Sequence, residues 1–193
     1  MAAYLDRAAQ RLIERITTEQ RRVAKTPKVS QRVEPAVFAA VRVGRPETSD
    51  DLRGEFKRGR GYTGWQRSLY SQEWFDSSTE RSLAIILDVS DDISYWVRLQ
   101  RKDLEIAWEG GNYNPDFVAV DSEGVHWLIE VKSDKDAASE DVTAKREAAM
   151  RWANTVSAAP KLNGVRWRNL LAREADVAQA KDSWPALRGL GAA

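Results

Sequence analysis

The chain has 193 residues, of which 42% are hydrophobic and 31% charged, so it is long enough to bury a sizeable core. It contains no cysteine, which excludes disulfides and thiolate metal sites and fits a cytoplasmic protein. No apolar run approaches the ~20 residues of a membrane helix, and charged residues interrupt any segment resembling a signal peptide at the N-terminus.

The net charge of +1 hides an asymmetry between the two ends of the chain. Residues 1–70 hold 15 Lys/Arg and 8 Asp/Glu, whereas residues 71–193 hold 15 and 21. A basic front segment could hold a phosphate backbone beside an acidic metal site further along the chain. For residues 1–30 taken alone, a solvated charged helix is the simpler interpretation.

The first sixty residues are expected to form an accessory segment, and residues 61–193 the main domain. An apolar stripe at helical spacing predicts an amphipathic N-terminal helix over residues 3–24, which ends at Thr26-Pro27. A strand is expected near residues 37–43, followed by a loop over residues 44–51.

Residues 53–67 combine basic, glycine and aromatic residues in a pattern typical of nucleic-acid contacts. Basic side chains can hold phosphates, and the interleaved aromatic rings can stack on bases. A glycine-rich loop whose rings pack into the core explains the pattern equally well, so both interpretations stay open. The candidate nucleic-acid ligands of this segment are Arg53, Lys57, Arg58 and Arg60.

The middle of the chain is predicted to alternate helices and strands. Ser77 as an N-cap and Glu80 in the first turn indicate a helix that runs to about residue 88. Apolar patterning predicts strands at residues 93–99, 104–108, 117–120 and 125–131, a helix over 138–157 and a strand over 165–171. A short helix over 174–181 and a tail from residue 184 follow. This order predicts an α/β fold in which helices flank both faces of a sheet.

Two of these strands flank a polar turn at residues 121–124 and predict a β-hairpin. If the hairpin is centred on Glu123, Asp116 lies directly opposite Glu130, with Cβ atoms about 5 Å apart. Lys132 then shares their face, because residues two apart on a strand point the same way. A centre half a residue earlier would place the two carboxylates on opposite faces, so the predicted chemistry depends on the register.

Two carboxylates at one point repel each other unless a cation lies between them. Hard oxygen ligands of this kind suit Mg²⁺, which usually takes one or two protein carboxylates and keeps several waters, with Mn²⁺ as the expected substitute. Judged on the tripeptide Glu130-Val131-Lys132 alone, a structural ion pair is the simpler interpretation of the lysine.

Pro115-Asp116 followed by Glu130-Val131-Lys132 resembles the PD-(D/E)XK nuclease superfamily. Over roughly residues 62–152, the sequences GYTGWQRSLY, FDSSTE, YNPDF and LIEVK together resemble the C-terminal endonuclease domain of type III restriction enzymes and related helicase-nucleases. The resemblance implies a restriction-endonuclease-like core, with a mixed central sheet in αβββαβ order, in residues 61–193. It also implies a Mg²⁺-dependent DNA endonuclease.

The resemblance further implies a role for each motif residue. Asp116 and Glu130 would bind the metal, with the carbonyl of Val131 as a third ligand, and Lys132 would orient the attacking water. Glu80 would reach the metal site from the preceding helix. Judged locally, an exposed acid that stabilises the helix dipole is the simpler interpretation, whereas the match to FDSSTE favours the functional one.

Three other residues near the motif have two interpretations each. Lys145 resembles a family position whose side chain faces the catalytic pocket, and is equally explained as a solvent-facing lysine. Tyr113 and Asn114 either line the site or shape the turn before Pro115. His126, the sole histidine, is interpreted as structural because it has no partner for a zinc site.

The chain contains no G-x-x-x-x-G-K-[ST] loop, so no ATPase activity of its own is expected. The resemblance implies DNA as the substrate and a helicase, translocase or modification subunit as a partner in a restriction or defence system; a homodimer is left open. The alternatives are a catalytically silent nucleic-acid-binding or assembly module of the same fold, and a repair or transposition nuclease.

Overall fold

The computed structural model describes residues 44–101, 103–160 and 164–191, which belong to one compact unit. The predicted helix over residues 3–24 and the predicted strand at 37–43 lie outside the described residues. The expected division of the chain at residue 60 stays a prediction.

A four-stranded sheet in the order β4-β7-β8-β9 forms the centre of this unit. Strands β4, β7 and β8 are antiparallel to their neighbours, whereas β9 runs parallel to β8, so the sheet is mixed. The bounds of its strands are Ile93–Arg98 (β4), Phe117–Asp121 (β7), His126–Lys132 (β8) and Trp167–Arg173 (β9).

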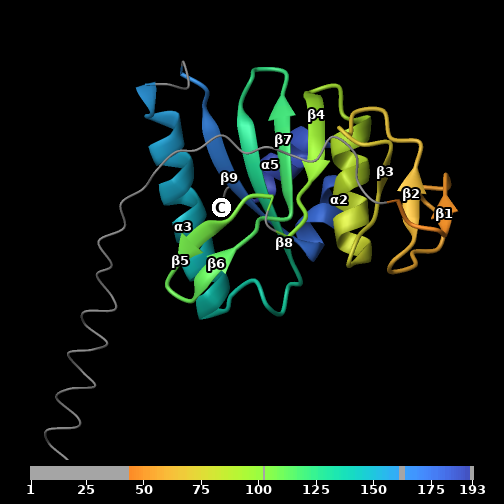
Figure 1. The fold of residues 1–193 in the computed structure, drawn as a ribbon, viewed down its shortest axis with the longest axis horizontal. Helices are drawn as coiled ribbons and strands as arrows, with labels where there is room; N and C mark the ends of the chain where they lie inside the picture. The colour runs from red at the N-terminus through yellow and green to blue at the C-terminus, as the bar shows by residue number, and fades with distance from the viewer. Residues whose placement is uncertain (1–43, 102, 161–163, 192–193) are drawn as a thin grey trace, which may run out of the picture. The chain divides into compact units, whose positions relative to one another are not determined.

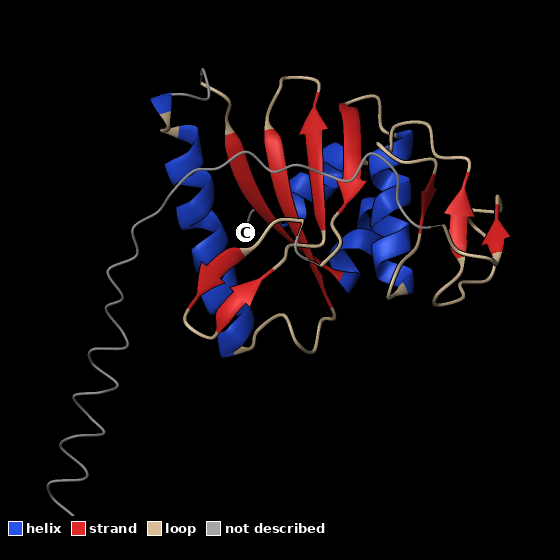
Figure 2. Ribbon diagram, in the orientation of Figure 1, coloured by secondary structure: helices blue, strands red, loops and turns tan. Residues whose placement is uncertain are grey.

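Helices lie on both sides of the sheet, with α3 on one side and α2 on the other (Figure 1, Figure 2). Their bounds are Ser78–Val89 (α2), Glu140–Ser157 (α3), Glu174–Ala180 (α4) and Trp184–Gly191 (α5). Helix α2 precedes β4, and α3 connects β8 to β9, so the sheet and these helices have the predicted αβββαβ order. Among the described residues, every helix is too short or too polar to cross a membrane.

Successive residues of the strands enter two hydrophobic clusters, one on each face of the sheet. Trp96, Phe117 and Ile129 belong to the cluster that includes the buried face of α2, whereas Val118 and Leu128 belong to the cluster beneath α3. All five residues of β7 are buried. This confirms the expectation that the apolar strands are covered on both faces, as in an α/β sheet.

Local signals set the start of α2 as predicted. The hydroxyl of Ser77 accepts a hydrogen bond from the amide of Glu80 (3.1 Å), which satisfies one of the free amides of the first turn. The buried face of the helix carries Leu83, Ala84 and Leu87, at the spacing expected for an amphipathic helix.

The strand predicted at residues 104–108 does not join the central sheet. It forms β5 (Ile106–Trp108), which pairs only with β6 (Gly111–Tyr113) in a two-stranded ribbon. Gly111 has a φ of +125°, a conformation that glycine adopts without steric cost. The glycine turn therefore folds the strand back on the next segment before it can reach the sheet, and the ribbon packs against α3.

The prediction of a tail from residue 184 was wrong, because residues 184–191 form helix α5. The hydroxyl of Ser183 accepts a hydrogen bond from the amide of Ala186 (3.3 Å), and Pro185 lies in the first turn, where proline is tolerated. Trp184 and Leu187 are fully buried. The sequence Ser183-Trp184-Pro185 contained this start signal.

A second, three-stranded sheet was not predicted. It consists of β1 (Thr48–Ser49), β2 (Gly61–Thr63) and β3 (Gln72–Glu73), and lies beyond α2 from the central sheet (Figure 1). Strands of two or three residues are too short to show an alternating pattern. Because β1 pairs with β2, residues on both sides of position 60 contribute to this sheet.

Candidate active site

The hairpin of β7 and β8 has the register that is centred on Glu123. Phe117 is paired with Ile129, and Val120 with His126. Of the two registers considered from the sequence, this is the one that brings the two carboxylates to one face. Gly124 has a φ of +76°, so the turn uses the glycine as expected.

Asp121 holds this register through three hydrogen bonds. Its Oδ1 accepts from the amides of Glu123 (3.0 Å) and Val125 (2.9 Å), and its Oδ2 accepts from the indole of Trp127 (2.9 Å). A slip of one residue would break the indole bond and place apolar side chains on the wrong face. The sequence had indicated only that Asp121 belongs to the turn.

Asp116 lies just before β7, where the regular hydrogen bonding between β7 and β8 ends. Its amide donates to the carbonyl of Ile129 (3.0 Å), so the simple ladder pairing with Glu130 is not formed. Instead, its Oδ2 accepts a hydrogen bond from the amide of Val131 (2.7 Å). Its carbonyl also accepts from the amide of Leu99 on the other side (2.8 Å). The main chain of Asp116 is therefore bonded to residues on both sides, and its carboxylate is bonded to β8.

Glu130 and Lys132 form an ion pair at the end of β8, with 2.5 Å between Oε1 and Nζ. Both side chains are largely buried, with 12% of the Glu130 side chain and 26% of the Lys132 side chain exposed. The second carboxylate oxygen of Glu130, Oε2, is buried and has no hydrogen-bond partner. The predicted ion pair thus exists, and it leaves one oxygen available to another ligand.

The charges of these residues shift each other's protonation. Burial and then repulsion by Glu130 raise the pKa of Asp116 to about 8, although the Val131 amide and Lys132 act in the opposite direction. Burial also raises the pKa of Glu130, against the influence of Lys132. Burial alone would lower the pKa of Lys132, but the negative charges of Glu130 and Asp116 have the larger combined effect and raise it. Two carboxylates that resist ionisation together are typical of a functional site.

Glu80 lies in the first turn of α2 and contacts a buried arginine. Its Oε2 accepts hydrogen bonds from Nε (3.1 Å) and Nη2 (3.0 Å) of Arg98, and from the amide of Asp76 (3.1 Å). Its charge raises the pKa of Asp116 and of Glu130, so it is close enough to influence both. A catalytic role of Glu80 stays a prediction, and no local pattern in the sequence indicates its bond to Arg98.

Lys145 and Tyr113 both line a small hollow beside Glu130. Nζ of Lys145 lies 4.8 Å from the ring centroid of Trp108, and its charge lowers the pKa of Glu130. The hydroxyl of Tyr113 donates to the carbonyl of Lys145 (3.0 Å). Asn114 instead donates to the carbonyl of Gln100 (2.8 Å) and so shapes the loop. Lys145 and Tyr113 thus line this hollow, whereas a part in a catalytic pocket stays a prediction for both.

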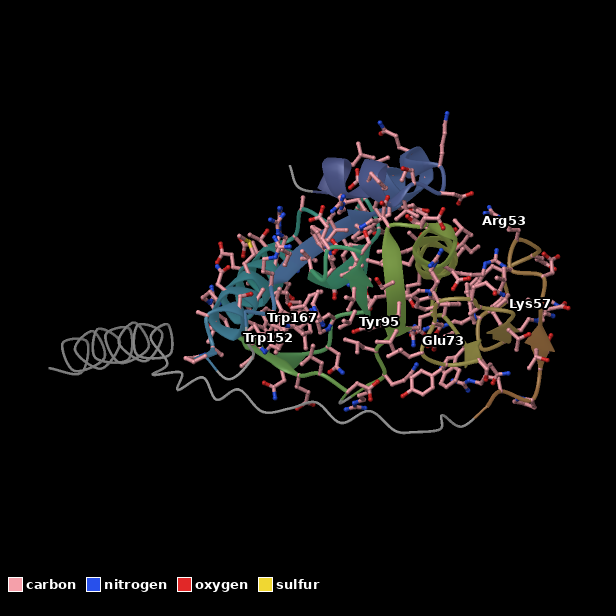
Figure 3. The ribbon with its side chains drawn as sticks, turned by 90° about the horizontal axis from the view of Figure 1, so that it is seen from above. Arg53, Lys57, Glu73, Tyr95, Trp152 and Trp167 are labelled. Carbon is pink, nitrogen blue, oxygen red and sulfur yellow. The ribbon has the colours of Figure 1, made fainter. Side chains whose placement is uncertain are left out.

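The other four candidate nucleic-acid ligands do not lie together with Lys145. Arg53 forms an ion pair with Asp182 (2.8 Å), Arg58 with Asp76 (3.3 Å), and Arg60 with Glu47. Figure 3 shows Arg53 and Lys57 beside the small sheet, at the opposite side of the unit from Trp152 on α3. Binding of nucleic acid by this loop stays a prediction.

The aromatic residues of the loop pack into the core, which decides between the two interpretations given for them. Tyr62 is fully buried, and Trp65 is 9% exposed. Trp65 lies edge-on to Trp96, with 5.1 Å between ring centroids, and Phe56 stacks on Tyr62 at 6.3 Å. These rings stabilise the fold and do not present faces to bases.

The oxygen atoms at the hairpin end fit a hard divalent cation. The buried Oε2 of Glu130 lacks a partner, and Asp116 is close enough for the charge of Glu130 to raise its pKa. Within the described ranges, His, Asp and Glu side chains form no group of three that could hold a metal ion. A cation here would therefore depend on two carboxylates, water and a main-chain carbonyl, as Mg²⁺ tolerates. The carbonyl of Val131 as that ligand stays a prediction.

A family model described as an endonuclease domain matches residues 66–170, more than half of the chain. The chain belongs to this endonuclease family. The match spans α2, β4, the hairpin and α3, and ends within β9, so it includes the whole αβββαβ core apart from its last residues. Comparison with curated proteins and with solved structures gives no match.

Membership in the endonuclease family confirms the broader part of the resemblance seen in the sequence. The protein is a nuclease with a restriction-endonuclease-like α/β fold. Asp116, Glu130 and Lys132 lie within the matched residues, as do Glu80 and Lys145. The closer relationship to type III restriction enzymes stays a prediction.

Proposed function

We propose that this endonuclease hydrolyses phosphodiester bonds of DNA with Mg²⁺, or Mn²⁺ in its place, at Asp116, Glu130 and Lys132. The observation that carries the proposal is the convergence of two buried carboxylates, each with a raised pKa, with one oxygen of Glu130 left unsatisfied. Two buried carboxylates without a compensating positive charge lower the stability of the folded protein, and a bound cation would supply that charge.

Each residue has a distinct part in the proposed reaction. Asp116 and Glu130 hold the cation, with the Val131 carbonyl as a third ligand, and the Val131 amide keeps the Asp116 carboxylate in place. When bound, Mg²⁺ would polarise the phosphoryl group and make water a stronger nucleophile. Lys132, held by Glu130, orients the attacking water and stabilises negative charge that develops on the phosphorus oxygens.

Glu80 is proposed to act on the site through its charge. One of its oxygens is occupied by Arg98, and Arg98 also contacts Asp76 (2.8 Å). Asp76 in turn pairs with Arg58 of the basic loop (3.3 Å). A chain of alternating charges therefore leads from the loop to the edge of the site. Through it, a phosphate bound near Arg58 would influence the field at Asp116.

We further propose that the chain is the nuclease module of a restriction or defence helicase-nuclease. The support is the sequence resemblance over residues 62–152 to type III enzymes, together with the lack of a phosphate-binding G-x-x-x-x-G-K-[ST] motif. DNA delivery then falls to a helicase, translocase or modification subunit. Activity of the isolated chain is expected to be low.

Nicking of supercoiled plasmid by the full chain tests the proposal. With Mg²⁺ and high protein concentration, the wild type is expected to convert supercoiled to open-circular DNA, and Asp116→Asn to lose at least ~100-fold of that rate. A chelator should abolish the reaction. Wild-type protein that binds DNA but never nicks it, with either metal, would favour the silent binding module instead.

A further inference from the structure

Arg146, on α3, lies near the carboxylates but, unlike Lys132 and Arg173, forms no ion pair with any residue that the structure describes. Lys132 is bound to Glu130, and Arg173 to Asp176, with 2.8 Å between Nε and Oδ2. In the part of the chain that the structure describes, no carboxylate forms an ion pair with Arg146. Its side chain is nevertheless half-buried, so it is not a freely solvated surface arginine.

The side chain of Arg146 lies where two hollows adjoin. The smaller hollow, of about 10 Å³, is also lined by Glu130 and Lys145. The larger hollow, of about 430 Å³, is also lined by Arg173. Leu171 lines both, so the larger hollow begins next to the carboxylate site and leads away from it past Arg146.

The register of β8 and β9 explains this continuity. Glu130 is paired with Leu171, and Lys132 with Arg173, in a parallel ladder. Paired residues on adjacent strands point to the same face, so Glu130, Leu171, Lys132 and Arg173 line one strip of the sheet edge. The first turns of α3, which carry Arg146, cover this strip.

The acids of the larger hollow already have partners. Oδ1 of Asp134 accepts a hydrogen bond from the amide of Ala175 (3.2 Å), and Asp176 is bound to Arg173. Of the two arginines that line the hollow among the described residues, Arg146 is therefore the one without an ion-pair partner. A guanidinium has a planar fork of donors that matches the oxygens of a phosphate.

We infer that Arg146 binds a phosphate of the DNA strand next to the one being hydrolysed, so that the larger hollow carries the strand away from Asp116 and Glu130. Arg146 is thus a positioning residue, not a metal ligand. The position of this phosphate next to the hydrolysed one rests on the proposed function. Contact between Arg146 and DNA does not, since it can be measured without cleavage.

Binding of a short labelled DNA duplex to the full chain, in a chelator and over a series of salt concentrations, tests this contact. Arg146→Gln is expected to weaken binding ~10-fold at low salt and to reduce the slope of log affinity against log salt by about one. Arg146→Lys keeps the charge and should retain most of the slope. Arg151→Gln is the matched control, because Arg151 lies on the same helix, has a side chain that is 58% exposed, and pairs with Glu147 at 3.7 Å.

A slope that is the same in Arg146→Gln as in Arg151→Gln would overturn the inference, as would a wild type that binds no DNA. Melting temperatures of both variants show whether a loss of binding reflects unfolding. Partial unfolding would lower the amount of protein that binds DNA, but it would leave the slope of log affinity against log salt unchanged. Plasmid nicking separates the two proposals. If the wild type nicks plasmid but Arg146→Gln has an unchanged salt slope, only the role of Arg146 is contradicted. If Arg146→Gln has a reduced slope but the wild type does not nick plasmid, only the proposed hydrolysis is contradicted.

Discussion

The carboxylate of Asp116 accepts a 2.7 Å hydrogen bond from the main-chain amide of Val131, across the hairpin. This bond ties the acid that precedes one strand to the residue between Glu130 and Lys132 on the other. The three charged residues of the motif are therefore held in place before any ligand binds.

Removal of the Glu130 charge is expected to weaken metal binding. Glu130→Gln should lower the affinity for Mn²⁺, measured by calorimetry, by at least ~10-fold, because it replaces a proposed ligand whose Oε2 is unsatisfied. Glu123→Gln, in the exposed turn of the same hairpin, is the matched control and should bind Mn²⁺ like the wild type. Equal affinities in the two variants would place the metal elsewhere.

Removal of the lysine charge should separate catalysis from metal binding. Lys132→Gln is expected to slow nicking ~100–1,000-fold, since it deletes a charge placed beside the reacting group. Mn²⁺ affinity should not fall, because the variant frees Oε1 of Glu130 from its ion pair. Lys135→Gln, in the exposed loop that follows, serves as control and should nick normally. A parallel loss of metal binding and nicking in Lys132→Gln would indicate a purely structural role.

Replacement of Glu80 is expected to affect stability more than metal binding. Glu80→Gln leaves Arg98 buried without one of its acidic partners, and such changes usually cost about 3–5 kcal/mol. Arg98 retains Asp76, so a loss of ~2 kcal/mol in the free energy of unfolding is expected. Urea denaturation measures this loss. If Mn²⁺ affinity falls as far as in Glu130→Gln, Glu80 is instead a direct ligand.

The raised pKa of Asp116 predicts a distinctive pH dependence of stability in the metal-free protein. The group binds its proton more tightly when folded, with a pKa of about 8, than when unfolded, near 4. Its contribution to stability is therefore fully present below about pH 4 and is lost as the pH rises through about 8. In a chelator, the melting temperature should fall from pH 5 to pH 9, and Asp116→Asn should flatten this fall.

Addition of Mg²⁺ should reverse that trend, because the cation binds the charged carboxylates and competes with protons. The increase in melting temperature on adding Mg²⁺ is expected to be larger at pH 8.5 than at pH 6. An increase that is independent of pH, or one that persists in Asp116→Asn, would contradict the assignment of Asp116 as a ligand.

Much of the fold could be predicted because its signals are local. The N-cap at Ser77, the glycine turn at Gly124 and the uninterrupted apolar strands act within a few residues of one another. The motif residues Asp116, Glu130 and Lys132 were located through this hairpin. By contrast, β1, β2 and β3 are too short to show periodicity, and α5 is marked in the sequence only by the short start signal at Ser183.

By itself, the sequence determined the αβββαβ order, the turn between β7 and β8, and which charged residues lie at the hairpin end, because spacing along a strand decides which side chains share a face. Only the tertiary structure decided which of the two registers forms and that Asp116 bonds to Val131 instead of entering the ladder. It also decided that Arg98 holds Glu80, and that Arg146 lies beside Glu130. These contacts join residues distant in the chain, and they form only when the sheet and its helices pack together.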